Sequence, residues 1–176
     1  MSSLTVQNIQ GSASSSNTIN VASGHKISGA AGSIIAPGQV IQTVYSQITS
    51  SETTTSNSYV DTGLHVTITP KYSSSKILIR ASVCLYQPNN AGAASVTVKR
   101  GSTNLSSASY GFGYIYIASG GGHVNQTPIE FLDSPSTTSA TTYRVQISTG
   151  VGVNLGTAYI SVNGTVSSIT LMEIAQ

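Results

Sequence analysis

Apolar and polar residues alternate along most of the chain after residue 38, with the period of two that is typical of a β-strand. The clearest case is the segment 76–86, where Ile77, Ile79 and Val83 share one face. The opposite face of this segment carries Lys76 and Arg80. The same alternation predicts further strands in segments 40–45, 64–69, 96–99, 114–117, 129–131, 143–148, 158–162 and 169–171.

Clusters of Ser, Thr, Gly, Asn and Pro separate these segments. Such residues are typical of turns and loops, and no segment shows a helical period. Alternating faces favour antiparallel sheets, because strands of a parallel sheet are buried on both faces and apolar throughout. About nine short strands separated by turns therefore predict an all-β fold, with an antiparallel, jelly-roll-like β-sandwich over residues 39–176. The predicted loops are 49–58, 73–75, 88–92, 101–104, 120–122, 134–142 and 163–167.

Residues 1–38 have a different pattern, rich in Ser, Gly and Ala with isolated aliphatic residues. Alternation is confined to the pairs Leu4/Val6 and Ile19/Val21, each too short to form a stable sheet within one chain. Pro37 and Gly38 end the region with a turn signal. This region is therefore either a disordered tail or a set of strands that complete their sheets with other chains.

Charge is scarce, at 7% of the residues, whereas Ser and Thr make up 52 of the 176. The net charge of +2 comes from scattered residues and forms no basic stripe, so we expect no nucleic-acid partner. No run approaches the roughly 18 apolar residues of a transmembrane helix, so we expect no membrane insertion. The first ten residues lack the pattern of a signal peptide, and we expect synthesis in a cytoplasm. Cys84 stands alone in an apolar segment, where a small buried residue is expected.

Titratable side chains are few and carry no catalytic motif or cofactor-binding motif. The closest carboxylates, Glu130 and Asp133, raise the possibility of a glycosidase pair. The alternative is that Asp133 begins a turn with Ser134 and Pro135. We favour the turn and expect a non-enzymatic protein without a cofactor.

Aromatic residues gather in the segment Tyr110–Tyr116, which a run of three glycines and His123 follow. Tyr114 and Tyr116 share a strand face, and exposed tyrosines suit carbohydrate or protein recognition. Tyr110, Tyr114, Tyr116 and His123 are therefore the candidate receptor-binding residues. The alternative is an ordinary strand whose tyrosines cover the sheet or fill a subunit interface.

Several strings resemble, in order, the short tail-fibre-like structural proteins of tailed bacteriophages from marine and cyanobacterial hosts. The segment NTINVASGHKISGAAGSIIAPGQVIQ resembles the end of a trimeric fibre shaft, and ITSSETTTSNSYVDTGLHVTITPKYSSSKILIRASV resembles the head that follows it. The strings VTVKRGSTNL, FLDSPSTTSATTYRVQIS and ITLMEIAQ extend the resemblance to the C-terminus.

The resemblance implies a homotrimer with a β-structured shaft over residues 1–38 and a sandwich head over residues 39–176. It places the chain in a virion, with other virion proteins of the tail, baseplate, collar or capsid as partners and a host-surface glycan as a candidate ligand. A purely structural capsid decoration or cement protein and a free carbohydrate-binding module are the alternatives. The implied contacts along the trimer axis are those of Leu4, Val6, Ile19, Val21, His25 and Ile27.

A three-fold axis bears on His25, because three copies of one histidine converge there. Three imidazoles suit a transition metal. The alternative is that His25, between Gly24 and Lys26, is a turn or surface residue that binds no metal. We favour the surface residue and expect no metal site.

Overall fold

The computed structural model describes residues 19, 21–29, 34–88, 92–150 and 156–176. The chain divides into two units, Met1–Ile34 and Ile35–Gln176, and each is described by itself. In the first unit the backbone turns where the N–H of His25 donates to the carbonyl of Ala22 at 3.0 Å. Leu4 and Val6 lie outside the described residues. The trimeric shaft and its boundary after residue 38 stay predictions.

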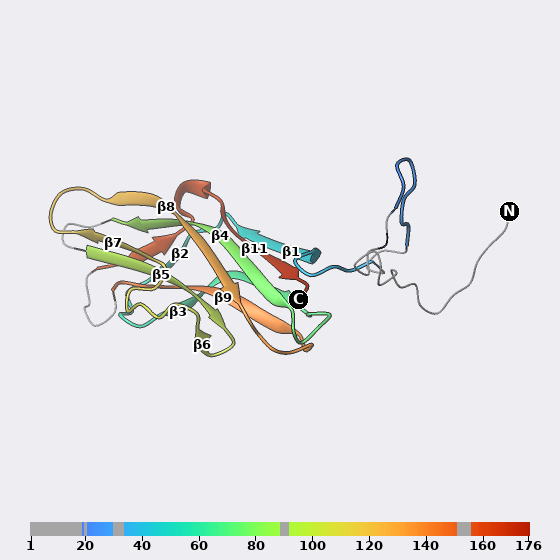
Figure 1. The fold of residues 1–176 in the computed structure, drawn as a ribbon. Coiled ribbons are helices and arrows are strands. Elements are labelled where there is room, and N and C mark those ends of the chain that lie inside the picture. The colour runs from blue at the N-terminus through green and yellow to red at the C-terminus, as the bar shows by residue number, and fades with distance from the viewer. Residues whose placement is uncertain (1–18, 20, 30–33, 89–91, 151–155) are drawn as a thin grey trace. The chain divides into compact units, whose positions relative to one another are not determined.

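The second unit is an all-β fold of two antiparallel sheets, as the alternating pattern predicts (Figure 1). In the six-stranded sheet, β1 pairs with β11, β11 with β4, and β4 with β8, while β10 pairs with both β4 and β2. Its strands are β1 (Val40–Ile48), β2 (Glu52–Thr54), β4 (Lys76–Gln87), β8 (His123–Asp133), β10 (Ala158–Ile160) and β11 (Ser167–Ile174).

The five-stranded sheet has the order β3-β9-β5, and β5 also pairs with β6 and β7 along its other edge. Long strands close in sequence thus lie in different sheets, since β3 and β5 belong to one and β4 to the other. The strands of this sheet are β3 (Val60–Ile68), β5 (Gly92–Arg100), β6 (Thr103–Asn104), β7 (Gly113–Ile117) and β9 (Thr141–Ser148).

The core lies between the two sheets and consists of the predicted apolar faces. On β4 the residues of the core cluster are every second one from Ile77 to Leu85. Side chains on successive strand residues point to opposite faces, so this alternation places one complete set in the core. The other strands contribute Leu64, Val66, Ile68, Val96, Val98, Ile115, Ile117, Ile129, Tyr143, Val145, Ile147, Ala158, Ile160, Ile169 and Leu171.

Three local features differ from the sequence expectation. The predicted loops 49–58 and 101–104 contain the short strands β2 and β6. The strand predicted over 158–162 ends at Ile160, and a 3₁₀ turn follows at Val162–Gly164. Ser161, just before this turn, and Asn163 within it have positive φ angles of 57° and 56°, which a strand does not allow.

Cys84 is buried, as expected for a small residue in an apolar segment. It lies outside the core cluster, because its side chain belongs to the outer face of β4. Its carbonyl accepts a hydrogen bond from the backbone N–H of Ser161, just before the 3₁₀ turn. No helix in the described part of the chain is long and apolar enough to cross a lipid bilayer.

Candidate functional site

Three exposed tyrosines form a row on and beside β7. The ring centroids of Tyr110 and Tyr114 are 4.5 Å apart, and those of Tyr114 and Tyr116 are 6.4 Å apart with the rings nearly parallel, at 9°. Their exposed fractions are 45%, 40% and 57%. Aromatic rings at this separation attract one another, so the row is a ready-made aromatic surface.

The strand pattern explains why the rings point outward. Ile115 and Ile117 enter the core, so the two alternating tyrosines face away from it. Across the β5–β7 pair, Tyr114 lies opposite Ser95 and Tyr116 lies opposite Ala93. These two partners are small and fully buried, so the bulk of this part of the outer face comes from the tyrosine rings.

The loop before β7 packs closely against Val96 of β5, and this contact fixes the position of Tyr110. Gly111 has a φ of +72°, and a Cβ there would collide with the carbonyl oxygen of Val96 and lie 2.6 Å from the hydroxyl of Tyr59. Phe112 then donates its N–H to that same carbonyl at 2.8 Å. Its ring packs on Phe131 of β8, with centroids 5.6 Å apart. The loop is therefore anchored at Gly111 and Phe112, directly after Tyr110.

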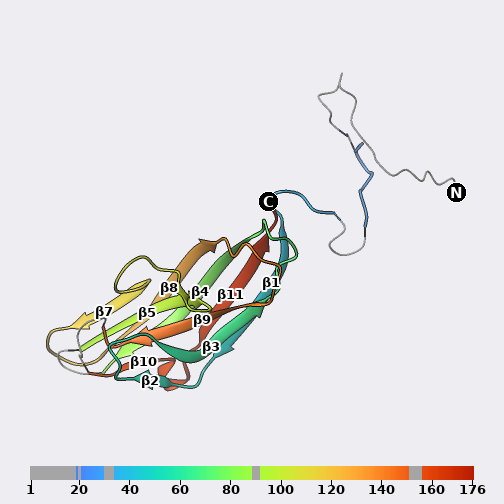
Figure 2. The ribbon, with the colours of Figure 1, turned by 90° about the horizontal axis from the view of Figure 1, so that it is seen from below.

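The row lies toward one end of the sandwich. The first and last strands of this unit, β1 and β11, pair up to the opposite end, where β1 begins and β11 finishes. At one end, Val40 of β1 pairs with Ile174 of β11, which pairs with Lys76 of β4. At the other end, β5 starts at Gly92 opposite Ile117. Figure 2 shows β7 at the end opposite β1 and the C-terminus. An aromatic surface at this remote end is accessible to a partner.

The tyrosines offer neutral hydroxyl groups. Burial raises the pKa of Tyr114, and the neighbouring hydroxyls of Tyr110 and Tyr116 raise it further. The ordinary tyrosine pKa is already about 10, so Tyr114 stays protonated at neutral pH and can donate a hydrogen bond. This combination of apolar ring faces and neutral hydroxyls suits an uncharged polar ligand such as a sugar.

A shallow hollow of about 450 Å³ adjoins the loop that carries Tyr110. Its lining is almost entirely hydroxyl and amide side chains, with Lys99 as the charged member among its described residues. Side chains of this kind donate and accept hydrogen bonds without adding a net negative field. The lining consists of Asn57, Ser58, Tyr59, Lys99, Ser102, Asn104, Ser106, Ser107, Ala108 and Ser109.

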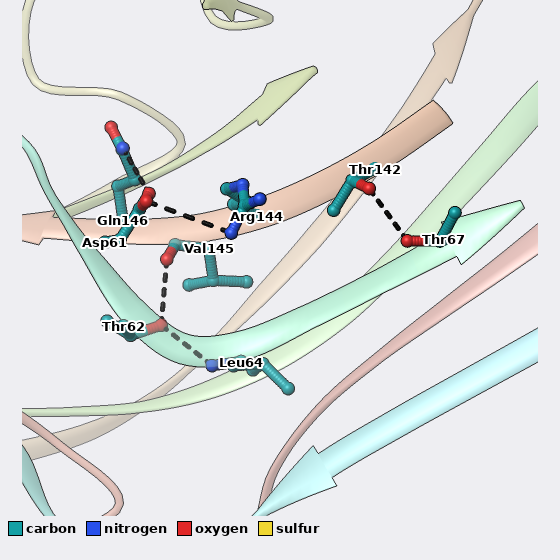
Figure 3. A network of polar contacts seen from close by, with 8 residues as sticks. All are labelled: Asp61, Thr62, Leu64, Thr67, Thr142, Arg144, Val145 and Gln146. Carbon is teal, nitrogen blue, oxygen red and sulfur yellow. Dashed lines mark hydrogen bonds and ion pairs between the residues drawn. The ribbon is translucent and has the colours of Figure 1, made fainter. Parts of the chain in front are cut away.

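The outer face of β3 and β9, in the same sheet, is polar and internally hydrogen-bonded (Figure 3). Gln146 donates from Nε2 to Oδ1 of Asp61 at 2.5 Å, and Nη1 of Arg144 lies 4.0 Å from Oδ2 of the same carboxylate. The hydroxyls of Thr67 and Thr142 are 2.8 Å apart. Because these groups are already paired with one another, this part of the sheet offers a partner less than the tyrosine row does.

The other predicted site residues belong to other elements. His123 is the first residue of β8, opposite Gln87 in the six-stranded sheet. Ile19, Val21 and Ile27 are exposed by 52%, 46% and 66%. His25 is also exposed, and its metal-binding role on a three-fold axis stays a prediction.

The suspected carboxylate pair is not a pair. Glu130 points outward from β8 and contacts Arg80 at 3.3 Å. Asp133, three residues later, points to the opposite face and is buried, with Tyr143 and Arg100 as its partners. Sequence reasoning assigned Asp133 to a turn and missed these contacts with two strands of the other sheet.

Among the described residues, no group of three or more His, Cys, Asp or Glu side chains is placed to hold a metal ion. No protein-family model matches the chain, and no curated protein matches it. The candidate site therefore consists of the three tyrosines and the adjoining polar hollow. Sequence reasoning found the tyrosines from their spacing and missed the hollow, because Ser and Asn residues are also common in other loops of this sequence.

Proposed function

We propose that this chain is a virion structural protein, a homotrimeric fibre subunit that projects from a tailed phage particle and contributes to host-surface attachment. The observation that carries the attachment role is the exposed row of Tyr110, Tyr114 and Tyr116 at the remote end of the sandwich. A fibre head needs its contact surface away from the end at which the chain enters, and this row meets that need.

Two further features support the fibre assignment. The sheet orders β1-β11-β4-β8 and β3-β9-β5-β7 are those of a jelly roll, which is common in viral structural proteins. In the first unit, Ile19, Val21 and Ile27 are exposed in the single chain. Two more copies around a three-fold axis would cover these aliphatic side chains.

The chemistry of the row favours a neutral glycan as the ligand. Sugar rings present apolar C–H faces that stack on tyrosine, and their hydroxyls match the Ser and Asn groups of the adjoining hollow. A free carbohydrate-binding module would use the same surface. A purely structural decoration protein would not need it, so binding separates the structural role from the other two.

A binding experiment with the full chain tests the attachment role. Fluorescently labelled protein is mixed with cells of the bacterium on which the phage grows, and the retained fraction is measured. We expect Tyr114→Ala and Tyr116→Ala each to weaken retention by about tenfold, as loss of a central aromatic contact does.

Tyr72→Ala is the matched control, because Tyr72 is 44% exposed and lies in the loop before β4, at the other end of the sandwich. We expect it to bind as the wild type does. Equal retention of all three variants would overturn the tyrosine site. A wild-type chain that the cells do not retain would favour the decoration role.

A further inference from the structure

The outer face of the six-stranded sheet, made by the outward-pointing side chains of β1, β11, β4 and β8, carries several large apolar side chains among polar ones. Figure 2 shows these four strands side by side. Register places Met172 next to Leu78, and Leu78 next to Leu132, in one row across three of them. Leu132 is 47% exposed, and Tyr45 on the neighbouring row of β1 is 56% exposed.

This face contrasts with the outer face of β3 and β9. There the corresponding positions are polar, such as His65, Thr67 and Arg144, and several of them are hydrogen-bonded to one another. The two sheets share one core, so burial within the chain does not explain why the outer face of β3 and β9 is polar while that of β1, β11, β4 and β8 carries exposed apolar side chains. Exposed apolar patches of several hundred Å² mark interaction surfaces.

The face is also close to electrically neutral. Its described charged residues are Arg80 and Glu130, whose side chains lie 3.3 Å apart, and Lys76 at the start of β4. A nearly neutral surface does not attract a nucleic acid or an acidic membrane. It does not repel a copy of itself, because Arg80 and Glu130 of each copy balance one another.

The size of the face matches a subunit contact. Strands about 4.8 Å apart, with about 3.4 Å per residue, give the four strands a flat area on the order of 600 Å². Protruding side chains make the accessible area larger than this flat area. A standard stable interface buries about 800 Å² on each partner. A hollow of about 560 Å³ at the centre, lined in part by Ser82, Ser168 and Thr170, leaves room for side chains of the occupant.

We propose that the outer face of the six-stranded sheet is the contact surface between copies of this chain. The proposal rests on the homotrimer of the proposed function. It adds which surface of the β-sandwich contacts the sandwiches of the other copies. Packing of this face removes Leu132, Leu78 and Met172 from water together, which stabilises the assembly through the hydrophobic effect. It leaves the tyrosine row of the other sheet free for a ligand.

Thiol accessibility tests the proposal in the full chain, since native Cys84 is 1% exposed and reports little background. Leu132→Cys and His65→Cys place one thiol on each outer face. We expect a maleimide to label the thiol at position 132 about tenfold more slowly than that at position 65, the protection that a tenfold excess of the associated form gives. The difference should vanish on dilution to the monomer.

A charged residue introduced on the face provides a second test of the proposal. In a Met172→Cys chain, an added Leu132→Arg should restore fast labelling, because a buried unpaired charge opposes the contact. An added His65→Arg, on the other sheet, should leave labelling slow. Both readouts report on the face itself, so they remain informative where the N-terminal region holds the three chains together.

Three results would overturn the proposal. They are equal labelling rates at positions 132 and 65 in an associated chain, slow labelling at position 132 in a chain that light scattering shows to be monomeric, and slow labelling at position 172 that persists with Leu132→Arg. The proposed attachment function would survive any of them if the tyrosine variants still lose cell binding. If the tyrosine variants still bind cells but the labelling rates are as predicted, the interface is supported and the attachment function is not.

Discussion

The carboxylate of Glu173, on the last strand, accepts a hydrogen bond at 2.8 Å from the backbone N–H of Lys71, 102 residues earlier. It also accepts from the N–H of Tyr72 at 3.3 Å and from Nε2 of Gln42. Glu173 is fully buried on the core side of β11. It therefore ties the loop between β3 and β4 to the end of the sandwich at which this unit begins.

Replacing Glu173 with Gln should destabilise the fold and change its acid response. Burial raises the pKa of Glu173, but hydrogen bonds from Gln42 and from the backbone N–H groups of Lys71 and Tyr72 outweigh burial and hold the pKa below its usual 4.5. The ionised carboxylate thus stabilises the folded state above pH 4.5, and this contribution is lost as pH falls through the lowered value.

Urea unfolding at one protein concentration measures both effects. At neutral pH, E173Q should lose about 1.5–3 kcal/mol, the range for hydrogen bonds to a charged group. Between neutral pH and about pH 3, the gap to the wild type should close. Glu52→Gln, at an exposed position of β2, is the control and should show neither change. A gap that stays constant with pH would contradict the assignment.

The buried hydroxyl of Tyr143 donates to Oδ2 of Asp133 at 2.7 Å, and Nε of Arg100 lies 3.4 Å from the same oxygen. Burial raises the pKa of Tyr143 far above 10, and the hydrogen bond to Asp133 and its negative charge raise it further, while Arg100 lowers it slightly. Stability is therefore complete below the unfolded-state pKa of about 10 and is lost as pH rises beyond it.

Tyr143→Phe should remove this alkaline sensitivity. We expect a loss of about 1–3 kcal/mol at neutral pH, because Asp133 loses a buried partner, and a smaller loss of stability than the wild type between about pH 9 and pH 11. Chemical unfolding at each pH measures the free energy, and absorbance at alkaline pH counts the tyrosines that ionise before unfolding. Equal alkaline slopes for the two proteins would refute the link.

Thr62 closes an irregularity in the pairing of β3 with β9, between Asp61 and His65 (Figure 3). Its hydroxyl donates to the carbonyl of Val145 at 2.8 Å and accepts from the N–H of Leu64 at 3.2 Å. Thr62→Val keeps the shape and removes both bonds, so it should cost about 1–3 kcal/mol in thermal or urea unfolding.

Thr67→Val is the matched control on the same strand, because Thr67 is exposed and bonds only to the hydroxyl of Thr142 among the hydrogen bonds of the described residues. Its effect should stay within about 0.5 kcal/mol. Similar losses for the two variants would show that the Thr62 bonds do not hold the irregularity.

The sequence predicted the core well because burial on one face imposes a period of two. Ile77, Ile79 and Val83 are buried as their spacing requires. It did not predict β2 or β6, because strands of two or three residues are too short to show a period. Nor did it predict that Glu173 is buried and hydrogen-bonded, because its partners come from distant segments and leave no local pattern.

The candidate site was predicted only in part, for a related reason. Tyr114 and Tyr116 alternate with core isoleucines, so their shared face follows from the strand period. His123 was grouped with them because it is near in sequence. The chain crosses from the five-stranded to the six-stranded sheet between Ile117 and His123, so His123 belongs to the other sheet. Its part in binding stays a prediction.

Assembly of the full chain gives a further prediction. Multi-angle light scattering should report three times the chain mass of 18.0 kDa, which is 54.0 kDa. A chain that lacks residues 1–38 should associate more weakly, because the exposed aliphatic side chains of Ile19, Val21 and Ile27 are lost with that region. A mass of 18.0 kDa for the full chain would contradict the trimer.

The position of the protein on an intact phage particle tests the proposed function most directly. Antibodies raised against the purified chain, followed by immunogold electron microscopy, test for it on particles of the tailed phage to which the proposal assigns the chain. We predict gold on structures that project from the particle, and competition for this labelling by soluble chain. Particles that an antibody to the capsid protein labels and this antibody does not would contradict the assignment.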